Sequence, residues 1–437
     1  MAGQMPRLRA PSDDPRPASA VSTGVGLAGL AGLLLWVAIG RSLDARGPLA
    51  ALCGLLACGV PMLAWSLLID KVHRNPSTGI DWSAPPRPAA ETRAISATKL
   101  AGLWATWAAI GCFYCIARWY WRGNYPFAMA VLGWAAVPLL LLSIPYVLWL
   151  DRRLTEPRDG AWHLGMLVGG RGGEADRGAI VEFLRAWTVK GFFLAFMLSI
   201  VPPNWWEVMA PPAGAILADP VALARWLIAL MFLIDVSFAT VGYALTLRPL
   251  DAHIRSANPY ASGCAAALIC YPPFILMAPG GPLDYQHDDH AWQALLAGWP
   301  LATAIVAAAL VLLAGIYAWA TVAFGLRFSN LTNRGILTHG PYAWTKHPAY
   351  LSKNLFWWLG SLPFLAASGS IVDAIRNTAI LAAVSGVYYW RALTEERHLG
   401  NDPDYRAYAG WMERNAPLPR LVRAWRRGTA PTAAPAE

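Results

Sequence analysis

Two short stretches near the C-terminus of this 437-residue chain carry side chains that could do chemistry together. The first stretch, 346–350, lies at the end of a polar segment, and the second stretch, 391–398, lies at the end of the last long apolar segment. Their titratable and aromatic members are Lys346, His347, Tyr350, Arg391, Glu395, Glu396 and His398. The sequence between them predicts two apolar helices joined by a tight turn at 368–370, and such a hairpin returns the chain to the end from which it started. We therefore expect both stretches to line one pocket.

Spacing within these stretches favours a pocket with fixed side chains. Arg391 and Glu395 are four residues apart, so on a helix they share a face and are expected to pair. Pro348 restrains the backbone directly after His347 and favours the first position of the next helix. Ionisable groups at the end of a membrane helix are unfavourable against lipid, so we expect them to face the interior of the bundle or a water-filled cavity.

This combination of cations, carboxylates and aromatic rings suits a nucleoside that carries an amino acid. A cation would bind the ligand carboxylate, a glutamate would bind the ammonium group or the ribose hydroxyls, and aromatic faces would hold the adenine and a sulfonium. S-adenosylmethionine has all of these groups. A nucleotide with several phosphates would need more cations or a glycine-rich loop, and the sequence offers neither in this region.

The same region resembles a known family. Its elements are Gly-x-Tyr, a basic residue followed by His-Pro-x-Tyr, a helical hairpin, Arg-x-x-x-Glu-Glu and Tyr-x-x-Tyr. Over about 327–421 this pattern is similar to the isoprenylcysteine carboxyl methyltransferase family, and phospholipid N-methyltransferases are similar over the same stretch. The resemblance implies methyl transfer from S-adenosylmethionine to a lipid-like or isoprenoid-bearing acceptor in the membrane. Lys346 stands where the family has Arg, which keeps the charge but removes the bidentate fork.

The resemblance also implies a role for each matching residue. It places in the cofactor site Gly340, Tyr342, Lys346, His347, Pro348, Tyr350, Glu395, Glu396 and His398. It implies catalytic roles for Arg391, Glu395 and His347, with Arg391 orienting either the acceptor or Glu395. A carboxylate acceptor would need no general base, whereas an alcohol, phenol or amine would need one, and the candidates are His347, His398 and Glu396. No metal is expected in this site.

Composition indicates what kind of scaffold positions these residues. Apolar residues make up 56% of the chain and charged residues only 14%, where a soluble protein has roughly 25% charged residues. The mean hydropathy of +0.39 and the 23 tryptophans agree with helices that cross a bilayer and end in aromatic belts. These values exclude an ordinary soluble enzyme. The net charge of +9 is typical of basic loops on a membrane protein, so no nucleic-acid partner is expected.

We predict an all-α, polytopic bundle of about ten transmembrane helices. A span needs about 20 apolar residues, and the candidates are 22–40, 48–69, 98–118, 127–150, 188–202, 220–246, 262–279, 298–323, 354–371 and 374–393. Proline or glycine shortens or breaks the fifth, seventh and ninth of these. With these spans, 29 of the 35 Lys and Arg residues fall on one side, which predicts cytoplasmic termini. The composition suits a bacterial inner membrane.

The predicted organisation has a disordered tail over 1–21, an N-terminal bundle over 22–323, a catalytic module over 324–421 and a disordered tail over 422–437. The expected partners are membrane lipids and a lipid-like acceptor.

Two other functions stay open. The C-terminal hairpin is similar to that of membrane sterol and enone reductases, which use NADPH, although Glu395 and Glu396 would repel its 2′-phosphate. A non-enzymatic transporter or lipid-binding scaffold would fit the spans that proline breaks. The segment 286–290 has metal-ligand residue types, and we interpret it as an acidic exterior loop.

Overall fold

The computed structural model describes residues 15–285, 291–365, 369–417 and 420, and these are mostly helical. Its long helices are α1 (Thr23–Ser42), α2 (Pro48–Ala64), α3 (Ala89–Ile116), α4 (Tyr125–Asp151), α6 (Arg177–Met209), α8 (Pro220–Ala244), α11 (Pro300–Phe324) and α13 (Ile371–Leu399). Eight helices of the described part, one of them α2 extended to Ile69, are long and apolar enough to cross a membrane. The chain is therefore a multi-pass helical membrane protein, as its composition predicts.

Shorter elements connect these helices. The short α-helices are α5 (Gly160–Val168), α7 (Ala213–Ala218), α9 (Ala261–Leu268), α10 (Ala291–Leu295), α12 (Pro348–Ser361) and α14 (Pro403–Asn415). Single turns of other helix types are η1 (Trp65–Ile69), η2 (Val72–Arg74), η3 (Pro76–Thr78), η4 (Arg118–Trp121), η5 (Gly172–Glu174), η6 (Arg248–Leu250), η7 (Gly325–Arg327) and η8 (Gly340–Ala343). The strands β1 (Ser256–Ala257) and β2 (Thr332–Asn333) form one antiparallel pair.

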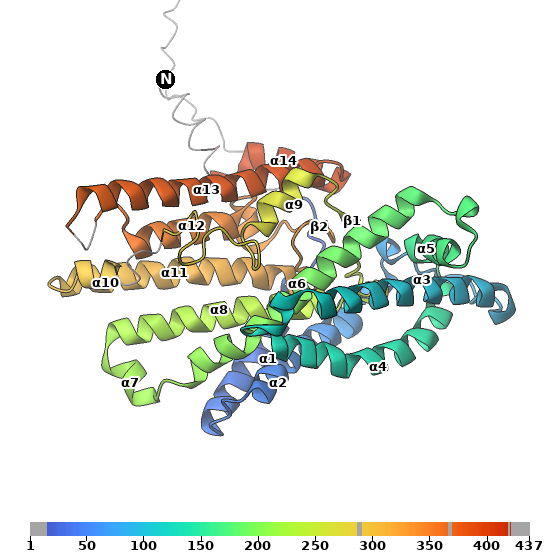
Figure 1. Cartoon of the computed structure of the whole chain (residues 1–437), viewed down its shortest axis with the longest axis horizontal. Helices are drawn as coiled ribbons and strands as arrows, with labels where there is room; N and C mark the ends of the chain where they lie inside the picture. Colours follow the sequence, from blue (N-terminus) through green and yellow to red (C-terminus); the bar gives the residue numbers. More distant parts are fainter. Residues whose placement is uncertain (1–14, 286–290, 366–368, 418–419, 421–437) are drawn as a thin grey trace, which may run out of the picture.

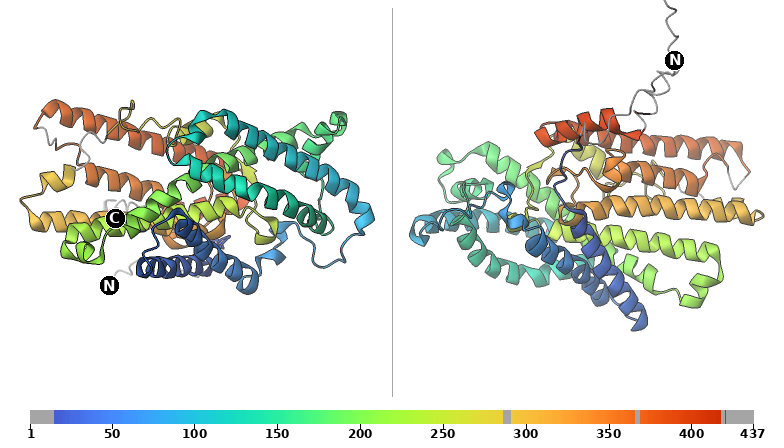
Figure 2. Two further views of the ribbon diagram at one scale, coloured as in Figure 1. Left: turned by 60° about the horizontal axis from the view of Figure 1, so that its bottom comes forward. Right: turned by 180° about the vertical axis from the view of Figure 1, so that it is seen from behind.

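The helices form two groups that meet along α6 (Figure 1). In one group α8, α11, α12 and α13 lie side by side, with α11 packed against both α8 and α12. In the other group α3 packs against α4 and α5. Helix α6 contacts both α8 and α4, and α1 and α2 pack as a pair against the first group (Figure 2).

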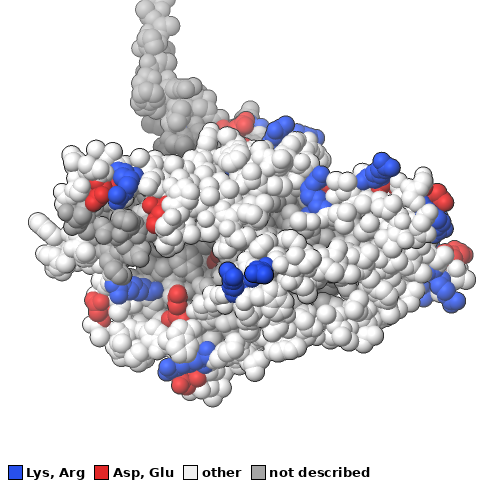
Figure 3. Space-filling model, in the orientation of Figure 1, with Lys and Arg blue, Asp and Glu red and all other residues white. Residues whose placement is uncertain are grey.

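The surface fits a hydrocarbon environment. The face shown in Figure 3 is largely uncharged, and its Lys, Arg, Asp and Glu side chains form small separate groups. Helix α4 exposes a run of leucines, among them Leu141 at 63% and Leu142 at 64%. A helix that is apolar on every side is expected to face lipid or the interior of a large bundle.

Two of the ten predicted spans are not long helices. In the seventh, 262–279, helix α9 ends at Leu268, and the following segment, which contains Pro272 and Pro273, is irregular. Residues of this segment pack against α12 and α13. Non-helical backbone is tolerated within a membrane where it is buried in protein, as it is here. In the ninth, α12 ends at Ser361, where Leu362 has a φ of +41° and Pro363 follows. The fifth is longer than predicted, because α6 continues through Pro202 and Pro203.

The described end of the N-terminal tail is bonded to the C-terminal half, although 1–21 was predicted to be disordered. The amide of Ala20 donates to the carbonyl of Ile336 at 2.9 Å, and the Thr338 hydroxyl donates to the carbonyl of Pro17 at 2.7 Å. The predicted tail 422–437 and the segment 286–290 lie outside the described residues.

Candidate functional site

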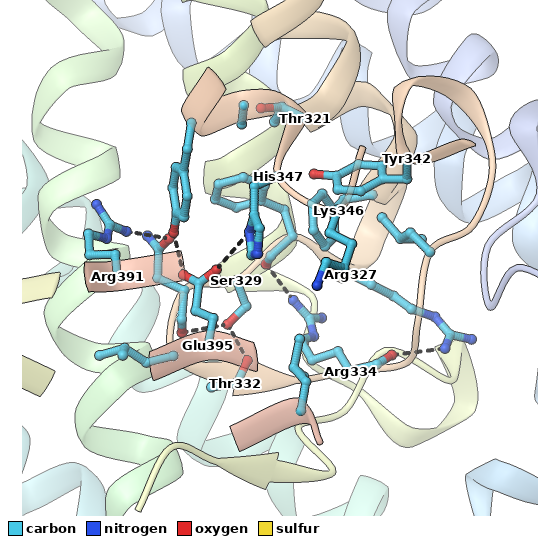
Figure 4. Close-up of a pocket in the computed structure, with 18 of the residues that line it drawn as sticks. Thr321, Arg327, Ser329, Thr332, Arg334, Tyr342, Lys346, His347, Arg391 and Glu395 are labelled. Atoms are coloured by element: carbon cyan, nitrogen blue, oxygen red, sulfur yellow. Dashed lines mark hydrogen bonds and ion pairs between the residues drawn. The ribbon is translucent and has the colours of Figure 1, made fainter. Parts of the chain in front are cut away.

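A cavity lies where the loop between α11 and α12 meets α12, α13 and α14 (Figure 4). Its empty space, including the open mouth, is about 1250 Å³. Of the residues predicted for the site, those that line it are Tyr342, Lys346, His347, Tyr350, Arg391, Glu395 and His398. The two C-terminal stretches therefore share one pocket, as the hairpin predicts.

Contacts between the first turn of α12 and the last turns of α13 bring His347 to the glutamates. His347 Nε2 donates to Glu396 Oε1 at 2.9 Å, and its Nδ1 lies 3.9 Å from Glu395 Oε2. Lys346 Nζ donates to the other oxygen of Glu396 at 2.7 Å. Pro348 is the first residue of α12, a position that suits its fixed φ and missing N–H. Glu396 therefore joins the start of α12 to α13.

Tyr350 connects this contact to the inside of the cavity. Its hydroxyl donates to Glu395 Oε1. Its ring lies parallel to the imidazole of His347, with the centroids 5.6 Å apart and an interplanar angle of 4°. The carboxylate of Glu395 thus lies close to both rings, and the hydrogen bond from Tyr350 holds its orientation (Figure 4).

Arg391 does not pair with Glu395, contrary to our expectation from their spacing. Its guanidinium carbon lies instead over the rings of Tyr271, Tyr350 and Tyr388, at 5.6, 5.1 and 5.2 Å from their centroids. The carboxylate of Glu395 is taken by Tyr350 from the neighbouring helix, so the pairing that an isolated helix would favour is replaced by a tertiary contact.

The donors of Arg391 are poorly satisfied. The residue is 3% exposed, and its Nε is buried without a hydrogen-bond partner. One terminal nitrogen makes a long contact of 3.5 Å to Asn330 Oδ1. A guanidinium has five N–H donors, so a cavity-lining arginine in this state can donate two parallel hydrogen bonds to a carboxylate.

Three predicted residues lie outside the cavity wall. Glu396 holds Lys346 and His347 from behind, and Pro348 starts α12. Gly340 has a φ of +59°, a conformation that favours glycine, and a Cβ there would lie 3.2 Å from the indole nitrogen of Trp319.

His398 contacts a segment outside the predicted catalytic module. Its Nε2 shares a hydrogen bond of 2.9 Å with Ser256 Oγ of β1. The strand β1 pairs with β2 of the loop that lines the cavity. A segment that follows α8 therefore helps to position the end of α13.

Two buried arginines shape the loop after α11. Arg334 donates to the carbonyls of Ala252, Gly242, Phe328 and Leu326. Arg327 donates to the carbonyl of Arg334 at 2.9 Å and to Asp251 at 2.8 Å. Burial, assisted by the nearby Arg327 charge, lowers the pKa of Arg334 to about 9. These arginines line the cavity, but they already donate hydrogen bonds to backbone carbonyls and to Asp251.

The sequence analysis missed a polar group that comes from the predicted N-terminal bundle. Asp235 of α8 accepts hydrogen bonds from the hydroxyls of Tyr317 and Thr321 of α11. Tyr317, Thr321 and Lys353 of α12 line the cavity. A single carboxylate in the apolar stretch 220–246 was a usable signal, because ionisable residues inside membrane helices are rare and usually functional.

Comparison with known proteins finds a family match over the cavity region but gives no activity. Residues 289–411 match the protein family of unknown function DUF1295. The match includes α11, which lies before the predicted module boundary at 324. No curated protein matches the chain significantly, and neither does any solved structure.

Proposed function

We propose that this protein is an S-adenosylmethionine-dependent methyltransferase that acts on a lipid-like acceptor in the membrane. The observation that carries the proposal is Arg391, a buried guanidinium with an unpartnered Nε in a cavity that also presents Glu395 and several tyrosine rings. S-adenosylmethionine, when bound, supplies a methyl group that is activated by a positively charged sulfur.

The residues present fit the groups of this cofactor. Arg391 binds the carboxylate of the amino-acid part through two parallel hydrogen bonds. Glu395, held by Tyr350 and facing His347, binds the ammonium group or the ribose hydroxyls. Other aromatic rings of the cavity lining, those of Tyr342 and Tyr405, can attract the sulfonium as a cation over an aromatic face.

The scaffold supports transfer by position and by exclusion of water. The cavity lies among helices that cross the membrane, so an apolar acceptor reaches it laterally from the bilayer. Holding two reactants in line lowers the entropic part of the barrier. A cavity mouth at the cytoplasmic boundary of a bacterial inner membrane is part of this proposal, and the predicted excess of Lys and Arg on the side of the termini supports it.

Ligand binding tests the proposal against its rival. The rival function is that of an NADPH-dependent reductase, so the detergent-purified chain is titrated calorimetrically with S-adenosylhomocysteine and with NADPH. We expect micromolar binding of the first ligand. Arg391→Gln is expected to weaken it on the order of 10- to 100-fold, since a hydrogen bond to a charged group contributes about 1.5–3 kcal/mol.

A matched control separates the site from the helix. Arg376→Gln removes the same charge from α13, where Arg376 forms a partly exposed ion pair with Asp373, and should leave the affinity unchanged. Binding of NADPH in place of S-adenosylhomocysteine would make the protein a reductase, and binding of neither would refute both enzymatic functions.

A further inference from the structure

One wall of the cavity carries a polar group that the proposed cofactor contacts do not use. We call Asp235, Tyr317, Thr321 and Lys353 the Asp235 cluster. Asp235 is 7% exposed and lies in α8, a helix long enough to cross the membrane. A carboxylate in such a helix is unfavourable unless it is satisfied, and it usually marks a function.

The cluster has the geometry of a proton path. The Tyr317 hydroxyl donates to Asp235 Oδ2 at 2.9 Å, and the Thr321 hydroxyl donates to Oδ1. Tyr317 and Thr321 line the cavity, whereas Asp235 lies behind them. The Tyr317 oxygen can therefore accept a hydrogen bond from a molecule in the cavity while its own proton points to Asp235.

Lys353 adds a basic group to this wall; burial lowers its pKa, and the nearby Asp235 charge favours its protonated form. Its Nζ lies over the rings of Tyr317, Trp357 and Tyr388, at 5.3, 5.2 and 5.8 Å from their centroids. A cation at this position repels an ammonium group and stabilises an oxygen that is losing its proton. The surrounding rings favour an aromatic partner by stacked or edge contacts.

We propose that the acceptor is an apolar molecule with a phenolic hydroxyl, and that Tyr317 passes the hydroxyl proton to Asp235. This inference rests on the proposed methyl transfer. The bond between the phenolic oxygen and the methyl carbon forms as the bond from that carbon to sulfur breaks. The phenol proton moves to the Tyr317 oxygen as the Tyr317 proton moves to Asp235, so Asp235 ends protonated and the other products are the methyl ether and S-adenosylhomocysteine.

Chemistry separates a phenol from the other acceptors. A phenolic oxygen becomes strongly acidic as its bond to the methyl carbon forms, so its proton can pass through the Tyr317 hydroxyl to the Asp235 carboxylate during the transfer. An ionised carboxylate acceptor carries no proton, so the hydroxyl path to Asp235 would have no role in its methylation. An amine would enter as a cation beside Lys353.

The test uses the full-length chain in lipid nanodiscs with radiolabelled S-adenosylmethionine. Three probes of similar size are supplied separately: para-octylphenol, decanoic acid and decylamine. The affinity for S-adenosylhomocysteine is measured on the same preparations. We expect methylation of the phenol. Tyr317→Phe and Asp235→Asn should each lower kcat about 100-fold at neutral pH, within the range of general base catalysis, and leave the S-adenosylhomocysteine affinity unchanged.

A pH profile distinguishes a proton path from a structural contact. With Asp235→Asn the rate should rise about tenfold per pH unit as the phenol itself ionises towards its pKa of ~10. The other titratable groups that face Asp235 are Tyr317 of α11, Lys353 of α12, Tyr342 of η8 and Tyr271 after α9. Because the Asp235 charge favours the protonated form of Lys353, the two profiles are compared by their slopes with pH and not by their absolute rates.

A matched tyrosine variant controls for loss of a buried hydroxyl. The Tyr114 hydroxyl donates to the carbonyl of Gly191 at 2.6 Å, outside the cavity lining, so Tyr114→Phe should keep the full rate.

The outcomes separate this inference from the proposed function. If S-adenosylhomocysteine binds but the phenol is not methylated, or Asp235→Asn keeps the wild-type rate at every pH, the phenol inference is wrong and the cofactor assignment stands. If S-adenosylhomocysteine does not bind, the methyltransferase proposal itself fails.

Discussion

Glu396→Gln tests whether the contact between α12 and α13 positions the cofactor site without touching the cofactor. Glu396 accepts from Lys346 at 2.7 Å and from His347 at 2.9 Å, yet it does not line the cavity. The side chains of Lys346 and Glu396 are 27% and 30% exposed, so their ion pair contributes at most about 1 kcal/mol. The His347 contact, a hydrogen bond to a charged group, contributes about 1.5–3 kcal/mol.

The expected loss of binding free energy in Glu396→Gln is smaller than the sum of the Lys346 and His347 contributions. Glutamine keeps one acceptor oxygen, so one of the two hydrogen bonds survives in weaker form. We therefore expect a loss of about 1.5–2 kcal/mol, which is roughly a 10- to 30-fold weaker affinity for S-adenosylhomocysteine. Calorimetric titration of the purified variant measures it. Glu413→Gln, an exposed change of the same kind on α14, is the control and should have no effect.

A double variant decides between positioning and direct contact. Lys346→Gln with Glu396→Gln should bind about as well as Glu396→Gln alone, because side chains in one network do not contribute additively. Additive losses, or complete loss of binding with Glu396→Gln, would mean that Glu396 contacts the cofactor itself, and the positioning argument would be refuted.

Two further predictions concern stability. Asp151 is fully buried and accepts from Lys99 Nζ at 2.6 Å, and Lys99 also pairs with Asp159 at 3.1 Å. Lys99 keeps this second partner in Asp151→Asn, so the substitution should destabilise the fold by about 1–3 kcal/mol, seen as a lower unfolding temperature. The affinity for S-adenosylhomocysteine should persist because Lys99 and Asp151 do not line the cavity. Burial, with help from the Arg248 charge, lowers the pKa of His253 to about 3, whereas the unfolded chain binds this proton near pH ~6.5. Acid therefore favours unfolding, and the free energy of unfolding should fall by up to about 2 kcal/mol between pH 7 and pH 5. Denaturant titrations of His253→Gln should lose that part of the pH dependence.

The meeting of His347 with Glu396 could be predicted because its causes are local. Pro348 starts α12, the chain reverses direction between α12 and α13, and these two helices are apolar enough to pack together. Each of these signals lies within a few residues of the element that it determines. Helix α12 is short for a similarly local reason, since Pro363 follows its last turn.

The Arg391–Glu395 prediction was wrong because it considered one helix alone. Spacing of four residues favours a pair by only about 0.2–0.5 kcal/mol. In the folded protein Tyr350 reaches Glu395 from α12, and three tyrosine rings surround the guanidinium. The weak preference of Arg391 and Glu395 to pair along one helix is therefore outweighed by tertiary contacts, which residue spacing in the sequence does not predict.

The partners of Asp235 could not be found from spacing either. Tyr317 and Thr321 lie 82 and 86 residues further along the chain, and they reach Asp235 only because α11 packs against α8. The sequence marks Asp235 as unusual within an apolar stretch, but only the packing of the two helices shows which hydroxyls satisfy it.

The same packing shows why the predicted module 324–421 does not make a complete cavity. Tyr271, Tyr317 and Thr321 line the cavity from outside that range. Ser256 and Asn258 bond to His398 and to the backbone of Thr394, so the chain after α8 also fixes the end of α13. The hairpin supplies the groups that suit the cofactor, whereas α8 and α11 supply the carboxylate and hydroxyls that suit the acceptor. If both proposals hold, a change in α8 should alter which acceptor is methylated, and a change in the hairpin should alter whether the cofactor binds.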